Sequence, residues 1–371
     1  MSGFRTQSKL KILQITSASS FGGGERYVAD LTNALVARGH DLYAVLRPHS
    51  PLLSHLNVES EKIKTLPMRN SLDVPSAHEM ARFVARHGIE VIHAHMARDY
   101  SLAAYAARRN RRAKFIVTRH VLFQLSRLHR HTLARAQRVI AVSNAVGREL
   151  RAQRILGERQ LAVVPNGVDV TRFAIDFDRS RFRQSMGLPP DGPLVASIGE
   201  LRTLKRHDDF IRAAARVVSQ FPETHFVLAG LDTSLSREVH KHLEQLVSET
   251  GLNGRFHFLG WVEEAEKLLN SIDVFVSASE TESFGLAIAE AMAAGTPVVA
   301  TATEGAQEVI DDQETGLLVP IGDVERIADS IALLLSDEER RRQIGKRARE
   351  AVNAKFSLQR MVDQIEQIYN D

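Results

Sequence analysis

Apolar residues in the first half of the chain follow two alternating spacings. Residues 9–16 form a short apolar run, and from residue 25 to 38 the apolar positions recur every three to four residues, at Val28, Leu31 and Leu35. The first spacing predicts a buried strand and the second an amphipathic helix. The alternation continues with predicted strands at 41–46, 91–93, 114–118, 138–142 and 161–164 and predicted helices at 76–87, 100–109 and 126–135. This order is typical of a doubly wound α/β domain.

A second alternation begins at residue 194. It predicts strands at 194–198, 225–229, 255–259, 273–277, 297–300 and 317–319, and helices at 207–219, 235–250, 286–294, 306–310, 324–334, 338–355 and 357–369. Residues 169–193 have little apolar periodicity outside 179–186, which predicts a linker. We therefore expect an α/β protein with two Rossmann-like domains, 1–168 and 194–356, and a terminal helix at 357–371 that returns to the first domain.

The most informative stretch runs from Glu280 to Ala300, between two predicted strands. Its helix is expected to begin after Phe284-Gly285 and to stop at Gly295, so that the first unpaired N–H groups point to the carboxyl end of the preceding strand. An open α/β sheet binds anions there. Glu282 and Glu290 could hold sugar hydroxyls beside such an anion, which suggests a sugar nucleotide. The alternative is a solvated loop charge and an exposed helix residue.

Composition narrows the class of protein. The chain has 371 residues, 44% hydrophobic and 25% charged, which suits two soluble domains. It has no cysteine, and its first residues lack the apolar core of a signal peptide, which favours a cytoplasmic protein. Charge is divided unevenly, since residues 1–175 carry 27 Lys and Arg against 12 Asp and Glu, whereas residues 176–371 carry 21 against 33. This asymmetry predicts different partners for the two domains.

Three motifs of the first domain are expected at strand ends or just after them. Gly22-Gly23-Gly24 opens a helix, but it lacks the G-x-G-x-x-G pattern of dinucleotide sites, and no Walker motif occurs. His93-Ala-His95 and Thr118-Arg119-His120 end two strands, and no nearby carboxylate completes a metal site. We expect these histidines near a phosphate or an acceptor hydroxyl. For His93, and also for His120, the alternative is a histidine fully satisfied at a strand end inside the fold.

Basic residues supply the remaining candidates. Lys205, with Arg202 or Arg206, follows the first strand of the second domain and could meet a diphosphate, although such loops are often only solvated. Asp176-Phe-Asp178 lies in the predicted linker, so its likeness to a metal-binding D-x-D is incidental. The basic runs at 108–114 and 127–138 lack the interleaved aromatics of a nucleic-acid site. An anionic membrane surface, an anionic acceptor or a merely solvated face remains open for them.

Together these residues resemble the retaining GT-B glycosyltransferases of family 4, almost end to end. The most specific marker is Glu282-Ser-Phe-Gly-Leu-Ala-Ile-Ala-Glu290, the E-x7-E of that family. The other markers, in chain order, are Gly22-Gly-Gly-Glu25, His93-Ala-His95, Thr118-Arg-His120, Val142-Ser143, Val164-Pro-Asn-Gly-Val-Asp169, Gly199-x-Leu-x-x-x-Lys205, Phe258-Leu-Gly260 and Gly295-Thr-Pro-Val-Val-Ala300.

The resemblance implies a role for each matching residue. Glu290 would hold the ribose hydroxyls, Lys205 the diphosphate, and Glu282 the donor sugar. His120 would lie beside the reacting centre, so that the catalytic set is His120, Glu282 and Lys205. The acceptor-side residues would be His93, His95, Arg119 and His120. The donor-binding residues would be Gly23, Gly24, Arg202, Lys205, Leu259, Glu282, Ser283, Phe284, Gly285, Leu286 and Glu290, with backbone N–H groups of Phe284 and Gly285 included.

Three positions depart from the family pattern. Glu200 stands where an arginine is usual, so Arg202 is expected to substitute for it. Ala306 replaces the second glycine of a later donor loop, and Gly230-Leu-Asp232 replaces G-D-G.

The resemblance predicts a hexosyltransferase-like enzyme that moves a sugar from a UDP- or GDP-type nucleotide sugar to a hydroxyl acceptor with retention. The acceptor would be a glycolipid, lipopolysaccharide or polysaccharide precursor. No cofactor, essential metal or nucleic acid is expected, and the basic first domain suggests peripheral association with the inner face of a membrane. The alternatives are a nucleotide-sugar 2-epimerase of the same fold and a non-catalytic nucleotide-sugar-binding protein.

Overall fold

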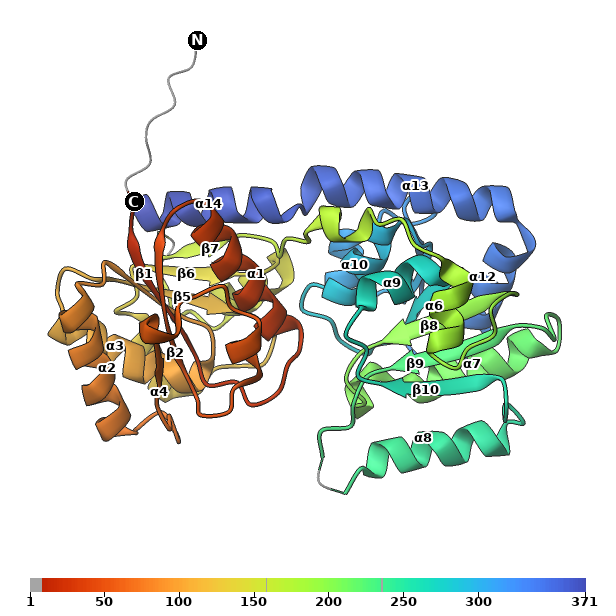
Figure 1. The fold of residues 1–371 in the computed structure, drawn as a ribbon, viewed down its shortest axis with the longest axis horizontal. Helices are drawn as coiled ribbons and strands as arrows, with labels where there is room; N and C mark the ends of the chain where they lie inside the picture. Colours follow the sequence, from red (N-terminus) through yellow and green to blue (C-terminus); the bar gives the residue numbers. More distant parts are fainter. Residues whose placement is uncertain (1–8, 158, 235) are drawn as a thin grey trace, which may run out of the picture. The chain divides into compact units, whose positions relative to one another are not determined.

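The computed structural model describes residues 9–157, 159–234 and 236–371. Residues 1–8, which lack the apolar core of a signal peptide, and Leu235, the expected start of a helix, lie outside this described part. The chain divides into two compact units (Figure 1). The first runs to Gly167 and also takes in Leu358–Asp371, and the second is Val168–Ser357.

The described residues of the first unit form a seven-stranded parallel sheet in the order β3-β2-β1-β4-β5-β6-β7. Its strands are β1 (Lys11–Thr16), β2 (Asp41–Leu46), β3 (Ile63–Thr65), β4 (Val91–Ala94), β5 (Lys114–Arg119), β6 (Arg138–Ala141) and β7 (Leu161–Val163). Its helices are α1 (Gly23–Ala37), α2 (Val74–His87), α3 (Ala97–Arg109), α4 (Arg127–Leu133), α5 (Asn144–Ala152) and α14 (Leu358–Asn370), with short 3-10 turns η1 (Pro51–Ser54) and η2 (Ser60–Lys62).

The described residues of the second unit form a six-stranded parallel sheet in the order β10-β9-β8-β11-β12-β13. Its strands are β8 (Leu194–Ile198), β9 (His225–Ala229), β10 (Phe256–Gly260), β11 (Val274–Ser277), β12 (Val298–Thr301) and β13 (Leu317–Val319). Its helices are α6 (Arg179–Ser185), α7 (His207–Val218), α8 (Glu238–Glu249), α9 (Ala265–Ser271), α10 (Leu286–Ala294), α11 (Glu304–Val309), α12 (Val324–Ser336) and α13 (Glu338–Lys355), with 3-10 turns η3 (Val170–Phe173) and η4 (Thr203–Lys205).

The expected class, two Rossmann-like sheets flanked by helices, is confirmed. The expected linker at 169–193 needs correction, because this segment belongs to the second unit. Phe173, Phe182 and Leu188 are buried in the same cluster as Phe284 and Met292. Large apolar side chains that are widely spaced along an irregular segment bury as effectively as those on a regular helix, but they leave no periodic signal.

Helix α14 is an integral part of the first unit and packs beside α1 (Figure 1). Its buried face includes Val362, Ile365 and Tyr369, and full burial of a Val or Ile side chain stabilises the folded state by roughly 1.5–3 kcal/mol. The same face carries Glu366, only 1% exposed, whose Oε1 lies 2.7 Å from His40 Nε2. A buried carboxylate needs such partners, and the other carboxylate oxygen of Glu366 contacts the Arg38 guanidinium of the first unit.

The described helices include none that is both long enough and apolar enough to cross a bilayer.

Candidate functional site

The carboxyl edge of the second sheet carries the β11–α10 turn. Gly285 adopts the left-handed conformation, with φ of 87°, immediately before Leu286 starts α10. A side chain there would be strained, and its Cβ would lie 3.0 Å from Ile288 Cδ1. Phe284 is buried against the ring of Phe356, at 5.4 Å between centroids, and anchors the turn. The first N–H groups of α10, which have no acceptor within the helix, are therefore presented by a fixed turn, as an anion site requires.

Lys205 and Glu282 meet beside this turn. Lys205 Nζ lies 2.6 Å from Glu282 Oε1, and Ser279 Oγ donates to the same oxygen at 2.8 Å. The two loops are joined as well by the Glu280 N–H, which donates to the Leu204 carbonyl at 2.9 Å. Lys205 comes from η4 and Glu282 from the loop after β11, 77 residues apart in sequence. Two predicted site residues thus lie in contact, and Ser279 joins them without having been predicted.

The start of α11 closes on the same loop. The Gly305 N–H donates to the Glu282 carbonyl at 3.1 Å. A Cβ on Gly305 would lie 2.6 Å from that carbonyl oxygen and 2.8 Å from the Phe284 nitrogen, closer than real Cβ contacts. Ala306, the departure from the family pattern, is fully buried, and its N–H is capped by Thr303 Oγ1 at 3.2 Å. The backbone of Gly305 therefore lies so close to the backbone of the Glu282 loop that a residue with a Cβ would not fit without moving that loop.

Glu290 lies in α10, eight residues after Glu282, and is half-buried. Three further predicted donor residues of this edge are also half-buried, namely Leu259, Ser283 and Leu286.

Glu200 accepts from Thr233 Oγ1 at 2.7 Å and lies 3.5 Å from Arg202 Nη1. Arg202 is exposed, so this pair adds little stability and leaves the guanidinium free to turn.

In the first unit, the glycine turn lies beside His120. The Cβ position of Gly24 is 4.0 Å from His120 Cγ. Helix α1 begins at Gly23, and the Gly22 N–H donates to Glu25 Oε2 at 3.0 Å, which caps the start of the helix. The sequence assigned Gly23 and Gly24 to the donor set and His120 to the reacting centre. The structure brings these residues together at the carboxyl edge of the first sheet.

His93 does not face a ligand, and the expectation that it lies on the acceptor side is wrong. It is fully buried, and both ring nitrogens are in use: Nδ1 lies 2.7 Å from Tyr369 Oη and Nε2 lies 2.7 Å from Thr118 Oγ1. Burial lowers the pKa of His93 to about 3. The histidine is a neutral part of the core, which was the alternative open from sequence.

His95 lies between His93 and His120. His95 Nε2 is 2.7 Å from Gln14 Oε1, and His95 Nδ1 is 3.4 Å from His120 Nε2. Burial, with the nearby Arg119 charge, lowers the pKa of His120 to about 3, so its ring is neutral at physiological pH. Gln14 was missed, although a single amide inside the apolar strand Lys11–Thr16 is a usable signal.

Arg119, predicted on the acceptor side, is 6% exposed and donates to the Phe123 carbonyl. This hydrogen bond orders the loop after β5, and the Arg119 side chain is not presented to solvent.

Among the residues that the structure describes, no group of three or more His, Cys, Asp or Glu side chains could hold a metal ion. Asp178 instead caps α6 by accepting from the Arg181 N–H at 3.0 Å, which gives the D-x-D segment a structural role.

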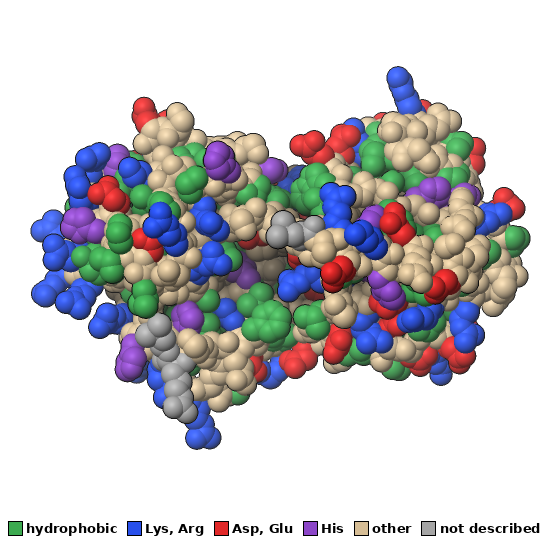
Figure 2. Space-filling model, turned by 90° about the horizontal axis from the view of Figure 1, so that it is seen from below, with side chains coloured by type: hydrophobic (Ala, Val, Ile, Leu, Met, Phe, Trp, Pro, Cys, Tyr) green, Lys and Arg blue, Asp and Glu red, His purple; other side chains and the backbone are tan. Residues whose placement is uncertain are grey.

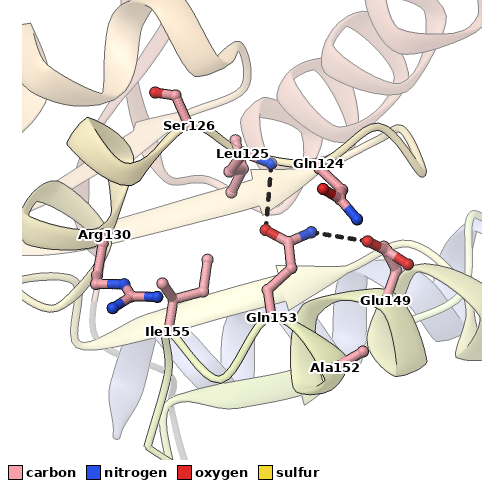
Figure 3. Close-up of a pocket in the computed structure, with 8 residues that line it drawn as sticks. All are labelled: Gln124, Leu125, Ser126, Arg130, Glu149, Ala152, Gln153 and Ile155. Carbon is pink, nitrogen blue, oxygen red and sulfur yellow. Dashed lines mark hydrogen bonds between the residues drawn. The ribbon is translucent and has the colours of Figure 1, made fainter.

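A polar cavity of about 290 Å³ is lined in part by Gln124, Leu125 and Ser126 (Figure 3). Gln153 spans it, accepting from the Leu125 N–H at 3.2 Å and donating to Glu149 Oε1 at 3.0 Å. Arg130 lines the opposite side. Sequence patterns did not predict this cavity, because α5, which carries Glu149 and Ala152, was not recognised as a helix.

Asp99 supplies a prediction about pH. Its carboxylate is fully buried, with Oδ2 accepting from the Ser17 N–H at 2.7 Å and Oδ1 without a partner among the described residues. Burial raises the pKa of Asp99 to about 6. The folded state therefore holds the proton more tightly than the unfolded state, and the stability this contributes below pH 4 is lost as pH rises through 6.

We expect Asp99→Asn to remove this titration. Relative to the parent protein, its free energy of unfolding should rise between pH 4 and pH 7 by about 2–3 kcal/mol. Urea unfolding at several pH values measures the difference, with exposed Asp191→Asn as the matched control. A difference that stays constant over this range would contradict the prediction.

Comparison with known proteins agrees with this geometry. Residues 178–351 match the family model described as Glycosyl transferases group 1, and residues 21–172 match Glycosyltransferase Family 4. A lipopolysaccharide core biosynthesis glycosyltransferase of Rhizobium meliloti, LpsE, is 30% identical over 92% of this chain and 94% of its own. The chain therefore belongs to the family 4 glycosyltransferases.

Two further relatives span nearly the whole chain. The N-acetyl-alpha-D-glucosaminyl L-malate synthase of Bacillus anthracis is 29% identical over 98% of this chain and 97% of its own. The crystal structure of Anabaena HepE in complex with UDP and glucose superposes with a TM-score of 0.85 at 22% identity, covering 97% of this chain and 99% of that one. The latter likeness shows the shared fold, which is the GT-B architecture.

Proposed function

We propose that this protein transfers a sugar from a nucleoside diphosphate sugar to a hydroxyl acceptor, with retention of configuration. The observation that carries the proposal is the contact between Lys205 and Glu282 at the start of α10, with Glu290 in the same helix. Cation, carboxylate and helix N–H groups then serve one ligand that is both anionic and rich in hydroxyls. A UDP- or GDP-sugar has both properties, and HepE was crystallised with UDP and with UDP-glucose.

The proposed residue roles rest on the resemblance of these motifs to the family pattern, and the charges of the side chains agree with them. Lys205 neutralises the diphosphate of the bound donor. Glu282 then gives up its contact with Lys205 and accepts hydrogen bonds from hydroxyls of the donor sugar. Glu290 accepts from the ribose hydroxyls, with Phe284, Gly285, Ser283, Leu286, Leu259 and Arg202 completing the donor site. His120 lies beside the reacting carbon, with Gly23, Gly24 and His95 around it. The reaction needs no metal in this proposal, because Lys205 and helix N–H groups supply the positive field.

The proposed chemical step balances without a cofactor. The bond from the anomeric carbon to the diphosphate oxygen breaks, and its electron pair leaves with the diphosphate. The acceptor oxygen forms the new bond on the same face, and its proton passes to the departing diphosphate oxygen. Lys205 stabilises the charge that develops on that leaving group, where preorganised groups contribute most.

The acceptor is proposed to be an anionic glycolipid, lipopolysaccharide or polysaccharide precursor reached at a membrane surface. Lys and Arg side chains gather over the first unit (Figure 2), and the relative LpsE is named for lipopolysaccharide core biosynthesis. Each Lys or Arg near an anionic lipid surface adds about 1 kcal/mol to the free energy of membrane binding. Sedimentation with anionic vesicles at low salt tests this part, and an unbound protein would contradict it.

Replacing Glu290 tests the donor site. A charge-assisted bond from a sugar hydroxyl is worth about 1.5–3 kcal/mol, so Glu290→Ala should weaken nucleotide-sugar binding about tenfold to a hundredfold. A ligand that binds only the folded state raises Tm, and a thermal-shift screen across nucleotide sugars measures this rise for both proteins. The exposed helical residue Glu350 provides the control, Glu350→Ala. Equal shifts in the parent and Glu290→Ala would show that Glu290 does not hold the donor.

A further inference from the structure

Seven polar side chains form one continuous hydrogen-bonded chain inside the first unit. They come from the carboxyl halves of three adjacent strands and from two helices. In order they are His120, His95, Gln14, Tyr369, His93, Thr118 and Tyr27. The successive distances are 3.4, 2.7, 3.4, 2.7, 2.7 and 3.4 Å. One end, His120, lies beside the glycine turn, and the middle depends on Tyr369 of the terminal helix.

Gln14 determines which atom donates and which accepts in each of these hydrogen bonds. Its Oε1 lies 2.7 Å from His95 Nε2, which suits an N–H donating to oxygen and is too short for two nitrogens. Its Nε2 therefore faces Tyr369 Oη, at 3.4 Å, and donates to it. Tyr369 must then direct its own proton to His93 Nδ1, and His93 Nε2–H donates to Thr118 Oγ1. Every neutral imidazole has one donor and one acceptor nitrogen, so each tautomer follows from its neighbour.

The same rule fixes His120. His95 uses Nε2–H toward Gln14, so its Nδ1 is an acceptor, and His120 Nε2–H is the group that faces it. His120 Nδ1 is then an acceptor and carries no proton. The low pKa values of His93, His95 and His120, caused mainly by burial, keep all three rings neutral.

We propose that Tyr369 is a positioning residue that sets the tautomer of His120, acting through Gln14 and His95. His120 consequently presents an acceptor nitrogen, which takes a hydrogen bond from a substrate hydroxyl and does not donate one. The role toward substrate rests on the proposed glycosyl transfer, whereas the tautomer is a property of the free protein. The terminal helix thereby contributes to the site without touching the ligand.

Tyr369→Phe is the direct test. It keeps the ring in its buried place but removes the hydroxyl that holds Gln14 Nε2 and His93 Nδ1. The Gln14 amide can then turn over, and His95 and His120 should populate both tautomers. In ¹⁵N-histidine spectra, the separate protonated and unprotonated ring signals of His120 should move toward an average. The expected kinetic result is about a tenfold fall in kcat, with the donor KM changed less than about twofold.

A second variant separates positioning from loss of structure. Gln14→Met keeps Tyr369 and a side chain of similar size, but it removes the oxygen that accepts from His95 Nε2–H. It should give the same change in the His120 ring signals and a similar fall in kcat as Tyr369→Phe. Tyr105→Phe, which removes a hydroxyl from half-buried α3, is the control and should change neither readout.

Circular dichroism establishes that each variant is folded. An unchanged His120 spectrum in folded Tyr369→Phe would overturn the inference, as would a parent spectrum with the proton on Nδ1. If the spectra respond as predicted but the parent transfers no sugar, the proposed function fails and the tautomer assignment stands.

Discussion

Lys205→Ala is expected to lower kcat/KM for glycosyl transfer by about two to three orders of magnitude. The substitution removes the ammonium that lies 2.6 Å from Glu282 and that is proposed to stabilise the leaving diphosphate. Loss of one preorganised group that meets developing charge typically costs this much. Glu282 keeps its bond from Ser279, so the loop should remain in place and the fall should appear mainly in kcat.

Steady-state kinetics with a donor identified by thermal shift provides the measurement. The exposed residue Lys241 of α8 gives the matched control, since Lys241→Ala removes the same charge from the same unit. Lys205→Arg should retain part of the activity, because it keeps the charge but not the geometry. Activity of Lys205→Ala within about threefold of the parent would remove Lys205 from the chemistry.

Gly305→Ala is the second change with a large expected effect. The added methyl would lie 2.6 Å from the Glu282 carbonyl oxygen, which belongs to the backbone and can move only with the whole loop. Overpacking of this kind costs about 1–3 kcal/mol of unfolding free energy. The displaced loop carries Glu282, so nucleotide-sugar affinity should also fall by at least about tenfold.

Denaturant unfolding and thermal shift with donor measure the two effects of Gly305→Ala. Gly157→Ala is the control, because its methyl would meet nothing closer than 3.5 Å, and it should stay within about 0.5 kcal/mol of the parent. Parent-like stability together with parent-like affinity would contradict the close approach of α11 to the Glu282 loop.

Much of the fold was predictable because buried parallel strands and amphipathic helices leave strong periodic patterns. Short elements escaped detection for the same reason: β3 has three residues and α9 has seven, too few to establish a period. The segment from Asp169 to Pro193 was misassigned because its buried aromatics are irregularly spaced. Tertiary packing, which no local pattern reports, decides such cases.

The candidate site was predictable to a different depth in each unit. The contact of Lys205 with Glu282 follows from strand order, since both loops leave the carboxyl edge of adjacent strands β8 and β11. His93 lies in β4 and His95 directly follows that strand, so the sequence places both on the acceptor side. Only the docking of α14 distinguishes the two histidines, because Tyr369 of this helix bonds to His93. His120 is left at the end of the hydrogen-bonded series of side chains. A helix more than 200 residues away gives no local signal of that contact.

The reaction itself is tested most directly by counting products. The protein is incubated with the nucleotide sugar that stabilises it most, with and without a lipid-linked or saccharide hydroxyl acceptor, and the mixture is analysed by mass spectrometry and NMR. We predict one nucleoside diphosphate released for each glycoside formed, only with acceptor, and with the donor's anomeric configuration retained. Conversion of the donor to an isomeric nucleotide sugar without acceptor, or an inverted glycoside, would contradict the proposed function.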